Sequence, residues 1–251
     1  MTSFLNFDSS ALSRLLTVLA VGANQPFFTA EEWAVRLQET PEAQAFSVQL
    51  QREWYPVTVP DALCQQMMDF AHDYLMPNEG WPHIWAHILR VTGAALALAP
   101  EAGVALNHAF MLGIFHDLGK LDEIISGQAH ELVGADLLRA TLNDHYPAQE
   151  IAHMANAIAK KASPRNPYMQ LLFDADKLDK IGATGIARRV SISTGADHFV
   201  VTLLRVKQDA VNFPEMHFPA SRQLADIKLD FTRQFFETLG FPYWPNTLSQ
   251  T

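Results

Sequence analysis

Two side chains that can bind a metal ion follow an apolar segment in the middle of the chain. Residues 109–115 are apolar throughout, and His116, Asp117, Leu118, Gly119 and Lys120 follow directly. A helix that is apolar on all sides lies in a protein core, and burying ionisable groups at its end is costly unless a partner neutralises them. A metal ion would neutralise them. His116 and Asp117 are separated by about 100° around a helix, so both side chains can reach one ion placed beyond its end. Without an ion, the pair would be a capped helix end.

Gly119 is predicted to end this helix in the left-handed conformation. His87 lies on a second apolar face, between Ile84 and Val91, where it is either a metal ligand or a core histidine. His130 begins a further apolar segment.

Three aspartates interrupt the apolar stripe of a helix predicted to begin after Asn166. They are Asp174, Asp176 and Asp179. Helical periodicity does not choose among them, because Asp174 and Asp176 flank the stripe about equally and Asp179 lies nearer its centre.

Four segments together resemble the HD-domain superfamily of metal-dependent phosphohydrolases. They are H-I-L-R-V (87–91), F-H-D-L-G-K (115–120), H-E-L-V-G-A (130–135) and D-A-D-K-L-D-K-I-G-A (174–183). The resemblance covers residues 73–240. It implies an all-α HD-domain helical bundle and a metal site. The implied metal ligands are His87, His116, Asp117 and Asp176, the last because the superfamily ligand belongs to an Ala-Asp dipeptide.

The resemblance also implies roles around the metal. His130 is our first choice for moving a proton, and Lys120 is placed to neutralise a phosphate oxygen. His83 is a candidate for lining the pocket. Lys160 and Lys161 stand where close relatives often carry a His-Ser pair, which favours one metal over two. Either lysine is a candidate phosphate contact, and the alternative for both is a solvated helix end.

The implied ligand set predicts the chemistry. Two imidazoles and two carboxylates suit Mn²⁺, Ni²⁺, Co²⁺, Fe²⁺ or Zn²⁺ better than Mg²⁺, and they leave coordination positions open. Such an ion can activate water and polarise a phosphoryl oxygen. We therefore expect hydrolysis of a phosphate ester or anhydride, with a nucleotide or another small phosphorylated metabolite as substrate.

Two other functions are considered. The His-Asp-Leu-Gly-Lys motif also resembles inositol oxygenase and related di-iron proteins, which need two more histidines, and Lys161 argues against a complete set. A non-catalytic sensor derived from an HD enzyme is the other alternative, although it would not need an intact ligand set. Metal analysis separates them: one Mn, Ni or Zn per chain favours the hydrolase, two Fe the oxygenase and none the sensor.

Composition limits the partners. Among 251 residues, 49% are hydrophobic and 18% charged, which is typical of a globular protein with a sizeable core. The net charge of −9 disfavours nucleic acid as a partner. Cys64 is the only cysteine, which fits a reducing compartment. The apolar stretch 15–21 is too short to span a bilayer. We therefore expect a cytoplasmic protein without a membrane partner.

The pattern of elements is helical throughout. Residues 1–58 are predicted to form a helical N-terminal extension, with a helix over 30–38, that packs on an HD-type domain over residues 59–245. Within that domain we expect helices from Asp61 to Leu75, from Pro82, over 109–115, from His130, over 151–158 and from Pro167, and two more between His198 and Leu239. A loop is expected to lead from Lys120 to Gln128.

Overall fold

The computed structural model describes residues 41, 44, 49, 53, 55–75, 82–191 and 196–238. Every regular element within these ranges is an α-helix, which confirms the all-α prediction. The helix predicted over 30–38 lies outside the described residues.

The chain divides into two compact units. The first, which we call the central unit, comprises Tyr55–Asp179 and Met216–Arg222; the second, the split unit, comprises Met1–Trp54, Lys180–Glu215 and Gln223–Thr251. The division at residues 58 and 59 inferred from the sequence stays a prediction.

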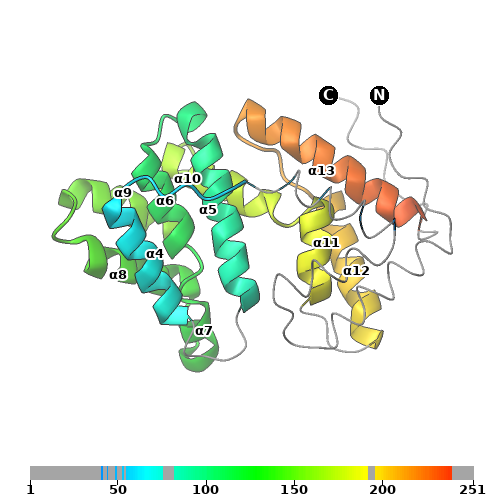
Figure 1. Cartoon of the computed structure of the whole chain (residues 1–251), viewed down its shortest axis with the longest axis horizontal. Helices are drawn as coiled ribbons and strands as arrows, with labels where there is room; N and C mark the ends of the chain where they lie inside the picture. The colour runs from blue at the N-terminus through cyan, green and yellow to red at the C-terminus, as the bar shows by residue number, and fades with distance from the viewer. Residues whose placement is uncertain are drawn as a thin grey trace. The chain divides into compact units, whose positions relative to one another are not determined.

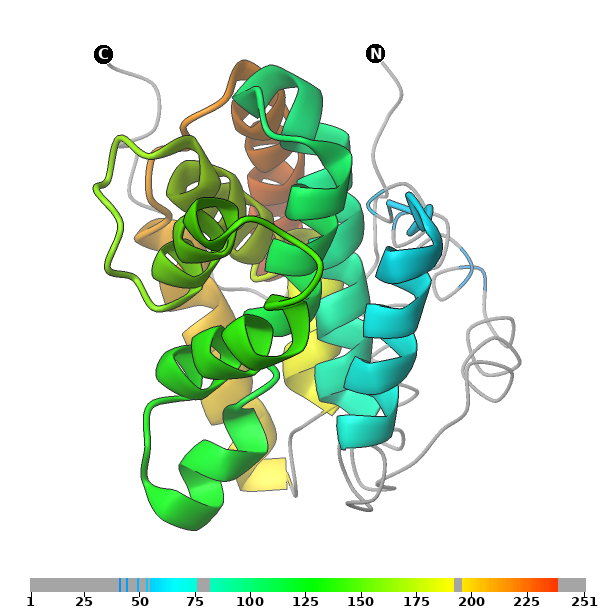
Figure 2. The same cartoon turned by 90° about the vertical axis from the view of Figure 1, so that its left-hand side faces the viewer.

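The central unit is built around one buried helix. Its helices are α4 (Ala62–Leu75), α5 (Pro82–Ala102), α6 (Leu106–Phe115), α7 (Lys120–Ser126), α8 (His130–Leu142), α9 (Ala148–Ile158) and α10 (Pro167–Leu178). Helix α6 packs against α4, α5, α8, α9 and α10 (Figures 1 and 2). Every residue of α6 from His108 to Phe115 is buried, as expected for a segment that is apolar on all sides.

Small residues let the helices of the central unit approach closely. A Cβ atom added to Gly113 of α6 would lie 2.5 Å from the Cα atom of Thr92 on α5. A Cβ atom on Gly134 of α8 would lie 2.4 Å from the carbonyl oxygen of Phe115. These contacts bring α5 and α8 against the end of α6, where His116 and Asp117 follow.

The region after α6 differs from the prediction. Gly119 is not left-handed, since its φ is −79°, and a seven-residue helix, α7, replaces the expected loop. Glycine is needed at 119 because an added Cβ atom would lie 2.5 Å from the Cβ atom of Val133 on α8. The left-handed glycine is Gly127, whose φ of 74° ends α7.

Other local predictions are confirmed. The apolar face predicted for α5 is buried at Ile84, Ile88, Val91, Ala95 and Leu98. The side chain of Asn166 accepts hydrogen bonds from the backbone N–H groups of Tyr168 and Met169, and Pro167 occupies the first turn of α10.

The split unit contains α11 (Gly182–Ser191) and α12 (Ala196–Val211), which pack together, and most of α13 (Pro219–Thr238). Helices α12 and α13 confirm the pair expected between His198 and Leu239. In the described part of the chain, no helix combines the length and apolar character needed to cross a bilayer.

Cys64 is expected to be chemically silent in the folded protein. Its side chain is fully buried in α4, and burial, together with the neighbouring Asp61, raises the pKa of the thiol to about 12. Below that pH the reactive thiolate is scarce. A thiol reagent at pH 8 should therefore label the native chain far more slowly than the chain in denaturant. Equal labelling rates would contradict the buried placement of Cys64.

Candidate metal centre

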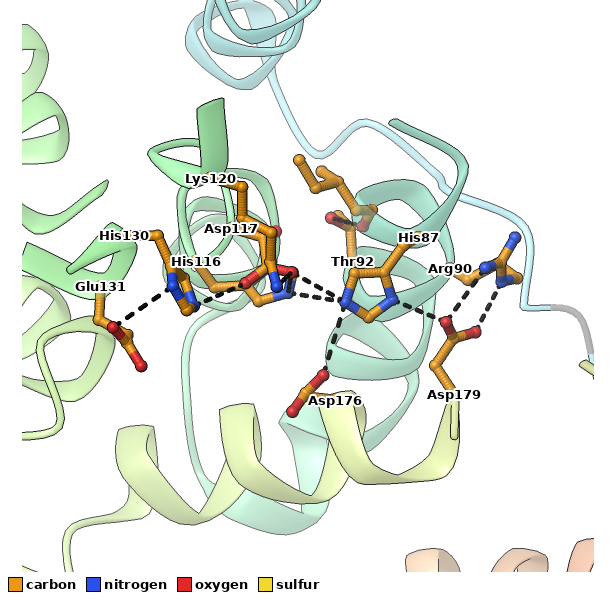
Figure 3. A network of polar contacts seen from close by, with 12 residues as sticks. His87, Arg90, Thr92, His116, Asp117, Lys120, His130, Glu131, Asp176 and Asp179 are labelled. Carbon is orange, nitrogen blue, oxygen red and sulfur yellow. Dashed lines mark hydrogen bonds and ion pairs between the residues drawn. The ribbon is translucent and has the colours of Figure 1, made fainter. Parts of the chain in front are cut away.

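Four side chains of the central unit converge on one point. The Nε2 atom of His87 lies 3.3 Å from Nε2 of His116 and 3.2 Å from Oδ2 of Asp117. The Oδ1 atom of Asp176 lies 3.5 Å from the same Nε2 atom of His87 (Figure 3). His87, His116 and Asp117 form a buried group with ligand atoms close enough to share one metal ion.

Three helices supply these residues. His87 belongs to α5, His116 is the C-terminal cap of α6, and Asp117 lies in the turn that follows. Asp176 belongs to α10, which packs against both α5 and α6. The packing of these helices brings together residues that are up to 89 positions apart in the sequence.

Hydrogen bonds fix which nitrogen of each histidine faces the centre. Nδ1 of His116 lies 2.7 Å from the carbonyl oxygen of Gly113, which can only accept, so this nitrogen carries the proton. Nδ1 of His87 likewise donates to Oδ2 of Asp179 at 2.7 Å. Both Nε2 atoms of the neutral rings therefore present lone pairs to the centre.

This arrangement fits a cation. Two nitrogen lone pairs 3.3 Å apart, with an acceptor oxygen beside them, repel one another unless a proton or a positive ion lies among them. Two neutral imidazoles and two carboxylates together balance the charge of a divalent ion, and they are ligands that first-row transition metals prefer.

The charge states of the buried groups agree with this role. Burial lowers the pKa of His116, which favours the neutral ring that binds metal. Burial alone would raise the pKa of Asp117, but His116, His130 and His87 lower it more, so its pKa falls well below the usual range. Asp117 is therefore a carboxylate.

Sequence reasoning did not assign a role to Asp179 or Arg90. Arg90 donates to Asp179 through Nε at 2.6 Å and Nη2 at 3.1 Å, and Asp179 in turn accepts from His87. Burial raises the pKa of Asp179, but Arg90 and His87 outweigh it, so the carboxyl stays ionised. The available signal was spacing: Asp179, the C-terminal cap of α10, follows Asp176 by three residues, as Arg90 follows His87 in α5.

Asp179→Asn is expected to weaken metal binding by roughly 10- to 100-fold. The carboxylate holds the proton of His87 on Nδ1 and the ring in place, whereas an amide can present an N–H donor to that nitrogen instead. Titration with Mn²⁺ or Co²⁺ against a chromophoric chelator would measure the change. The conservative Asp179→Glu variant should recover part of the affinity, and wild-type affinity in Asp179→Asn would remove this positioning role.

Asp174 points away from the centre. It is fully buried and accepts hydrogen bonds from the backbone N–H groups of His217 and Phe218, and from the Ser221 hydroxyl. Nδ1 of His217 also lies 2.7 Å from its Oδ1 atom. The structure thus brings Asp176, and not Asp174, towards His87.

His130 and Lys120 both contact the carboxylate of Asp117, each at a different oxygen. Nζ of Lys120 is 3.2 Å from Oδ2 of Asp117, and Nε2 of His130 is 3.4 Å from Oδ1 (Figure 3). Nδ1 of His130 is 2.8 Å from Oε2 of Glu123. The contact with Asp117 raises the pKa of His130, although its partial burial opposes this.

Glu123, His130 and Glu131 form a second group with metal-ligand spacing, half-buried rather than buried. Lys160, which has a left-handed backbone with φ of 55°, makes an ion pair with Glu131. Lys161 is exposed, and its backbone N–H donates to Asn156. His83 belongs to α5, but its side chain lies outside the described residues.

Comparison with known proteins agrees with the fold and the site. The family model described as "HD domain" matches residues 84–181, a range that contains all four converging residues. Fold, site and matched range together define an HD domain. The chain carries this domain over residues 84–181.

Among similar proteins is ribonuclease Y of Frankia alni, 30% identical over 133 residues, which cover 53% of this chain and 17% of that protein. The chain therefore matches less than a fifth of this relative's length. A solved HD-superfamily hydrolase of Bacillus thuringiensis is 25% identical, with a TM-score of 0.52 over 70% of this chain and 94% of that one. Bacillus subtilis YpgQ, solved in complex with ADP, is 22% identical, with a TM-score of 0.50 over 70% and 95%.

Proposed function

We propose that this protein is a metal-dependent phosphohydrolase that cleaves a phosphate ester or anhydride of a nucleotide or another small phosphorylated metabolite. The observation that carries the proposal is the convergence of two imidazole lone pairs with the carboxylate of Asp117 in a buried site. His87, His116, Asp117 and Asp176 would hold one divalent transition metal. Bound there, the ion would supply the Lewis acidity that activates water and stabilises charge on a phosphoryl group.

The remaining residues have roles that follow from their contacts. Lys120 carries a positive charge beside Asp117 and is about one-third exposed, so its ammonium can turn to a phosphate oxygen. His130 is held between Glu123 and Asp117 and is the candidate for delivering a proton to the leaving group from Nε2. Lys161 is a second candidate phosphate contact.

A nucleotide is the favoured substrate class. YpgQ has the same fold and was solved with ADP, which supports a nucleotide. The similarity to ribonuclease Y supports RNA as a second candidate. The net charge of −9 favours a small ligand, because a long phosphate backbone would be repelled over its whole length.

The test is phosphate or pyrophosphate release by the purified chain supplied with Mn²⁺, Co²⁺ or Ni²⁺. The panel contains nucleoside mono-, di- and triphosphates, an aryl phosphate and a short single-stranded RNA, with His116→Ala as the blank. Activity on nucleotides is expected. Activity on RNA alone would replace the substrate class, and a wild type equal to the blank throughout would refute the hydrolase.

Lys120→Ala provides an internal control. Because an ammonium is not a metal ligand, this variant should keep its metal and lose turnover of phosphorylated substrates. Lys161→Ala, in the same assay, shows whether the second lysine contributes. Unimpaired turnover in Lys120→Ala would leave the reaction class standing and remove the role given to Lys120.

A further inference from the structure

Helix α7 exposes two isoleucines beside the metal centre. None of its residues is buried, and it lies at the edge of the central unit, beside one end of α4 (Figure 1). Ile124 is 66% exposed and Ile125 is 76% exposed, the highest values among large apolar side chains in the part of the chain that the structure describes. Aliphatic groups left in water are available for burial by a ligand.

Polar contacts on two sides fix the orientation of α7. On one side, Lys120 pairs with Asp117 at 3.2 Å and Glu123 contacts His130 at 2.8 Å. On another side, Asp122 accepts a hydrogen bond of 2.8 Å from the hydroxyl of Tyr74 on α4. The face that carries Lys120 and Glu123 is therefore the face turned towards the metal centre.

The two isoleucines lie on different faces. Ile124 follows Lys120 by four residues and lies about 40° from it around the helix, whereas Ile125 lies about 140° from it. Ile124 thus lies on the same face of α7 as Lys120, one turn further from Asp117. Ile125 lies on a different face. The other side chains around His130 on this side of the central unit are charged, namely Glu123, Glu131 and Lys160.

We infer that Ile124 contacts the nucleobase of the substrate and so favours nucleotides over phosphate compounds that lack a base. The inference rests on the proposed function. A substrate whose phosphoryl group meets Lys120 can extend along this face of α7, and Ile124 is the apolar side chain one turn further on. An aliphatic side chain among charged neighbours gains by being covered with the flat, weakly polar face of a base.

The test compares Ile124→Ser with Ile125→Ser. Both replace an exposed isoleucine by serine in the same helix, so they share the change in helix propensity and differ only in face. Each full-length variant, loaded with Mn²⁺, is assayed on a nucleoside triphosphate and on inorganic triphosphate, which has the same reacting group but no base. Circular dichroism checks that both remain folded.

We expect Ile124→Ser to raise the KM for the nucleotide about tenfold, with kcat within about twofold and inorganic triphosphate unaffected. Ile125→Ser should match the wild type on both compounds. Equal KM values for the nucleotide in the two variants would overturn the inference, as would an equal rise on both substrates in Ile124→Ser. If the wild type turns over no nucleotide, the proposed function itself fails and the inference fails with it.

Discussion

Asp176→Ala is expected to empty the metal centre, whereas Asp174→Ala leaves it filled. The loss of affinity in Asp176→Ala should exceed the roughly 10- to 100-fold expected for a supporting residue such as Asp179. The reason is charge. Removing one of two carboxylates leaves a divalent ion in a buried site without full neutralisation.

Asp174 is a matched control two residues away in the same helix. Its replacement leaves buried donors from residues 217, 218 and 221 without their acceptor, which costs about 1–3 kcal/mol per unsatisfied group. The free energy of unfolding should therefore fall while the metal content stays near wild type.

Elemental analysis after dialysis against metal-free buffer gives the ions bound per chain, and His116→Ala and Asp117→Ala should behave as Asp176→Ala does. One ion per wild-type chain is expected. Equal metal loss in the Asp174 and Asp176 variants, both still folded, would show that Asp176 is not distinguished as a ligand, and loss in Asp174→Ala alone would reverse the assignment.

Glu53→Ala is expected to lower the free energy of unfolding by about 3–5 kcal/mol. Glu53 is buried at the start of α11 and accepts from the backbone N–H groups of Ala183 and Thr184, each at 3.0 Å. Its partner in charge is Lys228 of α13, at 2.9 Å and also buried. Removing the carboxylate would leave an ammonium without its counter-ion and the first turn of α11 without its acceptor.

A double-mutant cycle separates the ion pair from the other contacts. Urea unfolding followed by circular dichroism is measured for Glu53→Met, Lys228→Met and the double variant. The double variant should be less destabilised than the sum of the two single changes, because it leaves neither charge unpaired. A change within about 0.5 kcal/mol of wild type in Glu53→Ala, the range of ordinary surface substitutions, would contradict this account.

The sequence by itself predicted the helical class, the central helix and the residues that we propose as metal ligands. Residues 109–115 predicted α6, because a helix that is packed on all sides must be apolar on all sides. The family motifs singled out His87, His116, Asp117 and Asp176 because the side chains that bind metals are few and their spacing is distinctive. These signals are local in the chain.

Only the tertiary structure decided which groups support those residues. Glu53 meets its partners 130 and 175 positions further along the chain, and no local pattern indicates such a contact. Asp174 and Asp176 flank the same apolar stripe, so their separate roles depend on what packs against each side of α10. Gly119 is required by the approach of α8, and not by its own backbone angle. Helix α7 has no buried residue, so it lacks the apolar periodicity by which a helix is recognised in a sequence. Its polar side chains contact residues of α4 and α8, and only the tertiary structure shows these contacts.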